Sequence, residues 1–152
     1  MAAAELISRS KCVAGEVQVW THRSERLGCA MKFSLFVPPT SDNDEKCKTL
    51  VFLSGLTCTH ENFIQKSCAL KKAAELKLVL VCPDTSPRGL GIPGEDDSYD
   101  FGSGAGFYVD ATEEKWSKYQ MYSYIVSDLL GVASGVCGNI DTDRVGVFGQ
   151  SM

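Results

Sequence analysis

Three short, almost entirely apolar runs, separated by segments with helical spacing, constrain the fold of this chain more than any other feature. The runs cover residues 49–53, 78–82 and 145–148 and show no polar alternation, as expected of strands covered on both faces. Apolar residues recur at near-helical spacing in the intervening segments 60–77 and 121–132. Strands that alternate with helices pair in parallel through right-handed crossovers, so the pattern predicts an α/β protein with a mostly parallel sheet.

Two earlier segments predict strands that precede this alternating part. Residues 16–20 have strand composition, and residues 30–37 alternate so that one face carries apolar side chains. That face consists of Met31, Phe33, Leu35 and Val37. Two prolines follow, and the polar residues 40–48 predict a solvated loop. We therefore expect an antiparallel pair that leads into the sheet.

Residues 83–118 have no sustained apolar period and are rich in glycine, aspartate and aromatic residues. An irregular stretch of this length inside a compact domain is usually a functional loop. It leaves the carboxyl end of a predicted parallel strand, which is where open α/β sheets bind ligands. We therefore expect it to form a wall of the substrate site. The chain shows no internal repeat or linker, so residues 1–152 are expected to belong to a single domain.

The composition excludes several classes of protein. The chain is 44% apolar with a net charge of -4, and its lysines and arginines are scattered, so no nucleic-acid partner is expected. The N-terminus lacks the features of a signal peptide, and no apolar run is long enough to cross a membrane. Seven cysteines without C-x-x-C spacing favour reduced thiols over a disulfide framework or a metal site. We therefore expect a cytoplasmic protein without a membrane partner, metal or other cofactor.

A serine near the end of the chain has the sequence context of a catalytic nucleophile. Residues 145–148 predict a buried strand that runs directly into Gly149-Gln150-Ser151. In α/β-hydrolases a sharp turn of the G-x-S-x-G type after such a strand exposes the nucleophilic serine. Gly149 fits this turn because a side chain there would clash with neighbouring backbone. The alternative is an ordinary turn, since glycine and serine are common in turns.

A second segment, residues 54–59, leaves the first central strand and enters the first helical segment. From this position α/β-hydrolases contribute one backbone N–H to the oxyanion hole, and the residue after the nucleophile, here Met152, contributes the other. Losing one such donor typically costs about 2.7–4 kcal/mol of transition-state stabilisation. The alternative is a glycine turn in which Thr57 or Thr59 caps the helix, and both interpretations are compatible.

The only histidines, His22 and His60, are poor candidates for the general base that a nucleophilic serine requires. In α/β-hydrolases the acid and the histidine follow the serine in the chain, whereas both histidines precede Ser151. We expect each to be an exposed surface residue. The isolated chain is therefore expected to be unable to catalyse hydrolysis.

Six motifs together resemble the S-formylglutathione hydrolase family, also called esterase D. They are SGLTCT (54–59), PDTSPRG (83–89), GEDDSYDFG (94–102), GAGFYVDAT (104–112), MYSY (121–124) and FGQSM (148–152). The resemblance runs from about residue 11 to residue 152. It implies an α/β-hydrolase fold that is incomplete here, the N-terminal half of the sheet truncated after the elbow. It also implies hydrolysis of S-formylglutathione to glutathione and formate, with side activity on small acyl esters.

The same resemblance implies roles for individual residues. It places the nucleophile at Ser151 and the oxyanion-hole N–H groups at Leu56 and Met152. Gln150 stands where the family usually has histidine, a difference that is expected to alter the packing of the elbow. The chain ends before the aspartate and histidine of the triad. The resemblance implies small-molecule substrates and leaves open a homodimer of the full-length enzyme.

Side chains near the proposed site offer contacts for a glutathione thioester. Arg88 would pair with a carboxylate of the substrate and Tyr108 would line its wall, while acidic residues would attract its ammonium group. These acids are Asp100, Glu95, Asp96 and Asp97. Cys58 lies two residues beyond Leu56, so alkylation there is expected to block the pocket without the thiol being a nucleophile. The alternatives are a solvated loop anchored by its aromatic residues and a buried cysteine that acts as a small hydrophobe.

Two other functions remain open at this point. The first is a general carboxylesterase, or an acyltransferase, of the same fold. The second is a truncated, non-catalytic product that acts as an interaction module. The difficulty with the second is that a chain ending at the elbow would expose a sheet edge, which promotes aggregation.

Overall fold

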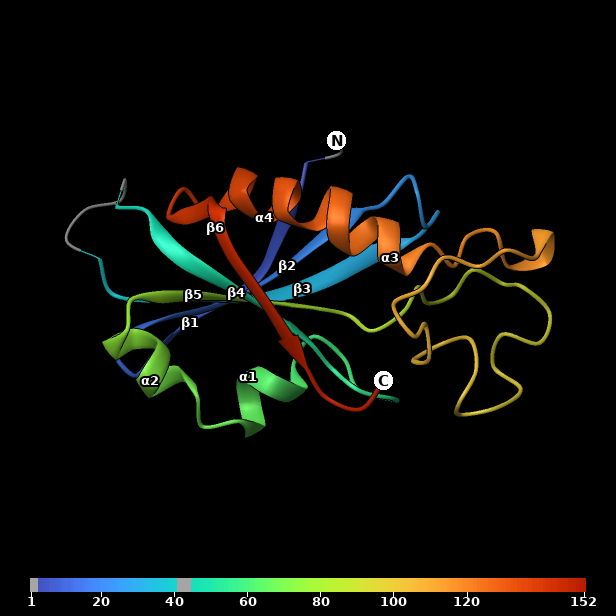
Figure 1. Ribbon diagram of the computed structural model, residues 1–152, viewed down its shortest axis with the longest axis horizontal. Coiled ribbons are helices and arrows are strands. Elements are labelled where there is room, and N and C mark those ends of the chain that lie inside the picture. The colour runs from blue at the N-terminus through green and yellow to red at the C-terminus, as the bar shows by residue number, and fades with distance from the viewer. Residues whose placement is uncertain (1–2, 41–44) are drawn as a thin grey trace.

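The computed structural model describes residues 3–40 and 45–152 and contains a mixed six-stranded sheet with helices on both faces (Figure 1). The strand order is β1-β2-β3-β5-β4-β6. The strands are β1 (Glu5–Cys12), β2 (Gly15–Arg23), β3 (Ala30–Val37), β4 (Cys47–Leu53), β5 (Leu78–Pro83) and β6 (Ile140–Gly149). The pairs β1–β2, β2–β3 and β3–β5 are antiparallel, whereas β4 lies parallel to both β5 and β6. The predicted antiparallel pair is confirmed, and β4, β5 and β6 run parallel as expected. The sheet is nevertheless mixed rather than mostly parallel, because β1 adds a further antiparallel pairing at the edge and β3 pairs antiparallel with β5.

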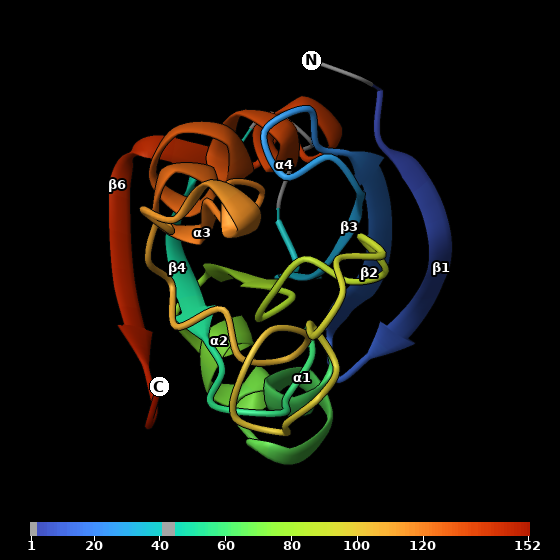
Figure 2. The same cartoon turned by 90° about the vertical axis from the view of Figure 1, so that its right-hand side faces the viewer.

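Short helices cover the two faces of this sheet (Figures 1 and 2). One face carries α1 (Asn62–Lys66) and α2 (Leu70–Glu75). The other carries α3 (Met121–Ser123), the π-helical segment η2 (Tyr124–Leu129) and α4 (Leu130–Val136). The helix predicted over 60–77 is broken near Cys68, which has a left-handed φ of 56°, whereas the one predicted over 121–132 is confirmed and extends to Val136. No helix in the described ranges is long and apolar enough to cross a membrane.

Burial on both faces explains why the central strands carry no polar alternation. Val79 and Val81 of β5 belong to the core beneath α3 and α4, whereas Leu80 and Cys82 belong to the core against α1 and α2. All four side chains are at most 2% exposed. Burying an aliphatic side chain of this size stabilises the fold by about 1.5–3 kcal/mol. The unbroken apolar run of β5 is therefore the sequence signature of a strand between two helical layers.

β6 departs from the expected burial of residues 145–148. It occupies the edge of the sheet beside β4, and Val147 and Phe148 are 60% and 40% exposed. The prediction of a strand buried on both faces was therefore wrong, because an apolar run does not reveal which strand lies at the edge. The predicted loop 40–48 is also shorter than expected, since β4 begins at Cys47, and residues 41–44 lie outside the described part.

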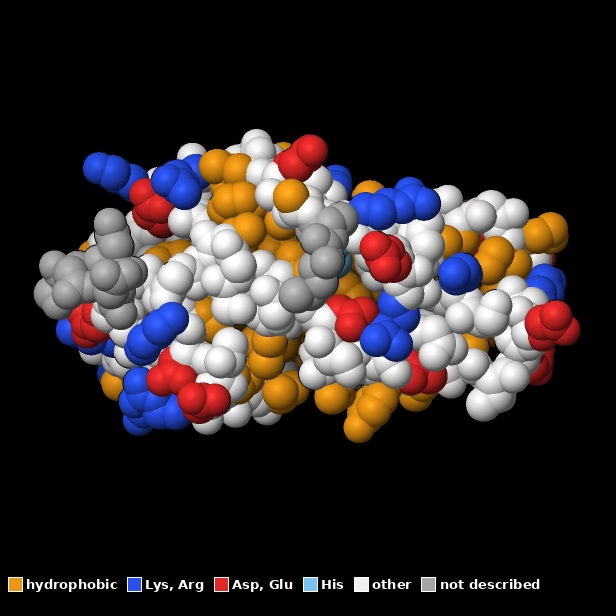
Figure 3. All heavy atoms as spheres, turned by 90° about the horizontal axis from the view of Figure 1, so that it is seen from above, with side chains coloured by type: hydrophobic (Ala, Val, Ile, Leu, Met, Phe, Trp, Pro, Cys, Tyr) orange, Lys and Arg blue, Asp and Glu red, His pale blue; other side chains and the backbone are white. Residues whose placement is uncertain are grey.

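The segment between β5 and α3 is long and irregular, as predicted, with only a short 3₁₀ turn, η1 (Glu114–Trp116), as a helical element within it. It lies at the end of the sheet where β4, β5 and β6 terminate (Figure 1). Glu95 helps to fix it from within, since its carboxylate accepts hydrogen bonds from Tyr119 Oη at 3.1 Å and from the Gly91 N–H at 2.7 Å. The face that carries α3 and α4 shows lysine and arginine interspersed with acidic side chains (Figure 3).

Candidate active site

The backbone at Ser151 has the strained geometry of a nucleophile elbow. Ser151 is exposed and adopts a left-handed φ of 64°, a conformation that non-glycine residues rarely keep unless the surrounding structure imposes it. The Gln150 N–H donates to the Leu53 carbonyl at 3.2 Å, which fixes the turn against β4. A Cβ atom added to Gly149 would lie 2.5 Å from the same carbonyl oxygen. The predicted crowding at Gly149 is thus confirmed.

The loop after β4 presses against this elbow. A Cβ atom on Gly55 would lie 3.1 Å from Ser151 Cβ and 3.7 Å from Ser151 Oγ, so a side chain at position 55 would crowd the serine. The Cys58 N–H donates to the Gly55 carbonyl at 3.2 Å and closes a turn around Leu56. Within the described residues, the N–H groups of Leu56 and Met152 donate to no protein acceptor. These are the two groups to which the family resemblance assigns the role of oxyanion donors.

The side chains of Arg88 and Tyr108 form hydrogen bonds to other residues of the chain beside this loop. The Arg88 guanidinium binds both oxygens of Asp84, with Nε–Oδ2 and Nη2–Oδ1 distances of 2.9 and 2.8 Å. Its Nη2 also donates to the Cys58 carbonyl at 3.1 Å. Tyr108 Oη donates to the Ser54 carbonyl at 2.8 Å. Sequence reasoning missed Asp84, although its spacing of four residues from Arg88 could have indicated an ion pair.

The acidic residues of the long loop separate into two groups. Asp100 is exposed and accepts a hydrogen bond from the Ser98 hydroxyl, and Asp96 and Asp97 are exposed as well. Glu95 is only 4% exposed, and both of its oxygens are bonded within the loop. The idea that Glu95 attracts a ligand is therefore wrong.

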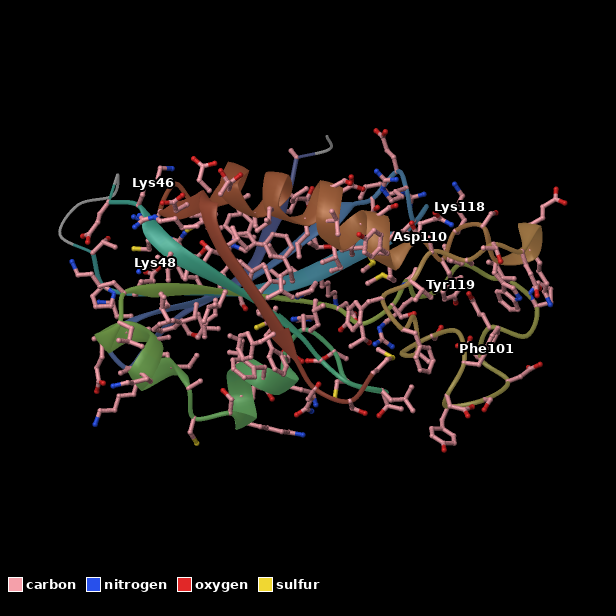
Figure 4. All side chains as sticks on the ribbon, viewed as in Figure 1. Lys46, Lys48, Phe101, Asp110, Lys118 and Tyr119 are labelled. Carbon is pink, nitrogen blue, oxygen red and sulfur yellow. The ribbon has the colours of Figure 1, made fainter. Side chains whose placement is uncertain are left out.

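The aromatic residues of the loop also differ in their placement. Phe101 packs edge-on against Trp116, with ring centroids 4.8 Å apart, and Tyr119 packs edge-on against the same ring at 5.8 Å. Figure 4 labels Phe101 and Tyr119 in this part of the molecule. By contrast, Tyr99 is 73% exposed. Anchoring to the core thus accounts for Tyr108, which packs against the core beneath α3 and α4. It does not account for Phe101 or Phe107, which are 44% and 48% exposed, or for Tyr99.

Cys58 lies in the wall of a pocket of about 360 Å³ beside the elbow. The lining residues are Phe52, Ser54, Cys58, Asn62, Phe63, Lys66, Ser67 and Gln150. The thiol is half-buried rather than enclosed in the core, so the alternative of a fully buried cysteine is wrong. A group attached to its sulfur would occupy the space next to Ser54 and Gln150.

Both histidines are buried, which corrects the prediction that they are exposed. His22 is 5% exposed, and its Nε2 shares a 2.9 Å hydrogen bond with Tyr124 Oη. His60 is 6% exposed, and its Nδ1 shares a 2.8 Å hydrogen bond with Ser34 Oγ. Each imidazole ring therefore forms its hydrogen bond with a side chain other than Ser151.

Burial also determines how these histidines titrate. It lowers the pKa of both His22 and His60 below the ordinary value, and for His60 the nearby Asp84 carboxylate opposes this effect in part. The unfolded chain then takes up protons at higher pH than the folded chain does. The histidine contribution to stability is thus complete above about pH 6.5 and is lost as the pH falls below that value.

We expect the free energy of unfolding to fall between pH 7 and pH 5, by at most about 1.4 kcal/mol per pH unit for each histidine. The cause can be checked by NMR titration of the two imidazoles, which should give both pKa values below those of a free histidine. A raised pKa at either ring would contradict this account.

Comparisons with known proteins agree with this geometry. Residues 24–152 match the protein family described as "Putative esterase". The S-formylglutathione hydrolases of Arabidopsis thaliana and Bos taurus are 48% and 50% identical to the chain over 146 and 147 residues. Each alignment covers 96% of this chain and 51% of the relative, so the chain spans about half the length of the curated relatives it matches.

Solved structures of related enzymes are also similar to this chain in fold. An S-formylglutathione hydrolase from Agrobacterium tumefaciens matches with a TM-score of 0.89 and 46% identity, over 96% of this chain and 52% of that chain. A ferulic acid esterase, 17% identical, matches with a TM-score of 0.65 over 92% of this chain and 52% of that chain, and this likeness concerns the fold alone. The predicted α/β-hydrolase fold and the resemblance seen in the motifs are confirmed.

Proposed function

The chain belongs to the esterase family, and from this premise we propose that the full-length protein, of the length of its relatives, hydrolyses S-formylglutathione to glutathione and formate. The observation that carries the proposal is the strained, exposed Ser151 with the loop at Gly55 pressed against it. S-formylglutathione is proposed as the substrate because the chain is 48–50% identical to about half of two S-formylglutathione hydrolases. We also propose that residues 1–152 belong to one hydrolase domain.

In the proposed reaction Ser151 Oγ attacks the carbonyl carbon of the thioester. The N–H groups of Leu56 and Met152 stabilise the oxyanion of the tetrahedral intermediate. Collapse of this intermediate breaks the C–S bond and releases glutathione, and water then hydrolyses the formyl-serine ester. Because His22 and His60 are bonded elsewhere, the base that accepts the serine proton is proposed to lie outside these 152 residues.

Residues of the long loop are proposed to recognise the glutathione part of the substrate. The exposed Asp100 carboxylate would attract the ammonium of the γ-glutamyl group. Cys58 would line the pocket beside the nucleophile. Arg88 already binds Asp84, so we propose that Arg88 and Tyr108 serve the site by shaping its wall.

A comparison of two thioesters tests the choice of substrate. We expect kcat/KM of the full-length protein to be at least about tenfold higher for S-formylglutathione than for S-formyl-N-acetylcysteamine, which lacks the charged groups. Asp100→Asn should reduce this preference, whereas the Asp143→Asn control on β6 should not. Equal rates for the two thioesters would instead favour a general carboxylesterase.

We further propose that the protein acts in the cytoplasm. The support for this proposal is that all seven cysteines carry free thiols, since disulfides are rare in reducing compartments.

A further inference from the structure

Residues 54–58, here called the oxyanion loop, are held by the segment that follows β5. Groups on residues 85–108 bond to backbone atoms of Ser54, Thr57 and Cys58. Leu56 lies between these bonded residues. The direction of its N–H is therefore determined by how firmly its neighbours are held.

The strongest of these attachments is at the Cys58 carbonyl. This oxygen accepts hydrogen bonds from Thr85 Oγ1 at 2.7 Å and from Arg88 Nη2 at 3.1 Å. Asp84 fixes both donors, because its carboxylate also accepts the Thr85 N–H at 2.7 Å and binds Arg88 through two hydrogen bonds. Asp84 and Thr85 are 6% and 0% exposed. The Arg88 side chain is 38% exposed, but its charge-assisted, bidentate pair with the buried Asp84 carboxylate leaves it little freedom to move.

Two further attachments hold the other parts of the loop. Tyr108 Oη donates to the Ser54 carbonyl at 2.8 Å, and the Thr57 N–H donates to the Gly104 carbonyl at 2.9 Å. Thr57 and Tyr108 both have left-handed φ angles, of 61° and 50°, as does Phe107 next to Tyr108. Non-glycine residues keep such angles only where surrounding contacts impose them. The two segments therefore constrain each other.

We propose that Arg88, through its pair with Asp84, and Tyr108 are positioning residues that hold the oxyanion loop against the Ser151 elbow. They touch no reacting atom in this role. By fixing the carbonyls on either side of Leu56, they keep its N–H directed at the developing oxyanion. This inference rests on the proposed hydrolase activity, and it gives Arg88 a role that differs from pairing with a substrate carboxylate.

Kinetics of the full-length protein separate the two roles of Arg88. Arg88→Met and Tyr108→Phe are expected to lower kcat for S-formylglutathione, by about ten- to one-hundred-fold for Arg88→Met, because a misdirected oxyanion donor weakens the transition state. KM should change by no more than about threefold, and Arg88→Lys should recover part of kcat. The matched control is Arg26→Met, which removes the bidentate Arg26–Asp128 pair on the surface and should leave kcat unchanged.

A second measurement does not depend on catalysis. Arg88→Met should raise the rate at which iodoacetamide alkylates Cys58 by about fivefold or more, because the loop opens more often. Peptide mass mapping gives this rate, and the exposed Cys68 serves as an internal reference that should not change.

Several results would overturn the proposal. A raised KM with unchanged kcat in Arg88→Met would show that Arg88 binds the substrate directly. If neither Arg88→Met nor Tyr108→Phe changes the rate of Cys58 alkylation, the oxyanion loop is held by other contacts. If Arg88→Met fails to fold, Tyr108→Phe, which removes one hydroxyl, decides the matter by the same two measurements. If the wild-type protein does not hydrolyse S-formylglutathione, the proposed function fails, and the alkylation rates still decide whether the loop is held in this way.

Discussion

Replacement of Ser151 by alanine is expected to lower kcat of the full-length protein for S-formylglutathione by about 10⁴- to 10⁶-fold. The substitution removes the attacking oxygen and leaves only the contribution of substrate binding and the oxyanion donors. Ser151 is exposed at the end of β6, so the loss of one oxygen should leave the fold intact. Steady-state kinetics and thermal unfolding of the same preparation measure the two effects.

The control for this variant is Ser127→Ala, which removes a hydroxyl from an exposed serine of η2. It should retain wild-type kcat. A Ser151→Ala protein that keeps even one-tenth of its activity would contradict the role of Ser151 as the nucleophile.

The second large effect is expected in the 152-residue chain by itself, which should show no turnover of S-formylglutathione or of a small aryl acetate above background. Ser151 needs a base to accept its proton. The two imidazoles of the chain are buried against Tyr124 and Ser34, so neither is available for this step. A spectrophotometric assay of the purified chain tests the expectation.

The same chain with Ser151→Ala is the matched control for that assay. Turnover that is present in the 152-residue chain and lost in this control would contradict the account. It would show that a base lies within the chain, and His60, released from Ser34, would be the first residue to test.

The order and type of the central elements could be predicted because buried strands and helices have a recognisable pattern of apolar residues in the sequence. β5 is apolar at every position from Leu78 to Cys82, since helices cover both of its faces. β1 has no such pattern, because seven of its eight residues are exposed. The sequence therefore does not predict this strand. The break between α1 and α2 depends on the left-handed backbone of Cys68, which no periodicity indicates.

Those parts of the candidate site that consist of residues adjacent in the chain could be predicted from the sequence. Gly149 and Ser151 could be recognised because the elbow is a local turn that follows a strand. The burial of His22 could not be predicted, because its partner Tyr124 is 102 residues away. The contact between Arg88 and the Cys58 carbonyl spans 30 residues and depends on how the long loop folds over the sheet. Long-range pairing of this kind is determined by tertiary packing rather than by spacing.

The most direct test of the central claim is to identify the serine that reacts with a fluorophosphonate probe in the full-length protein. Activated serine nucleophiles react with such probes, and peptide mass mapping locates the adduct. We predict a single adduct on the peptide that contains Ser151, and its absence in Ser151→Ala. An adduct on any other serine, or labelling that persists in Ser151→Ala, would contradict the claim that Ser151 is the nucleophile of this esterase.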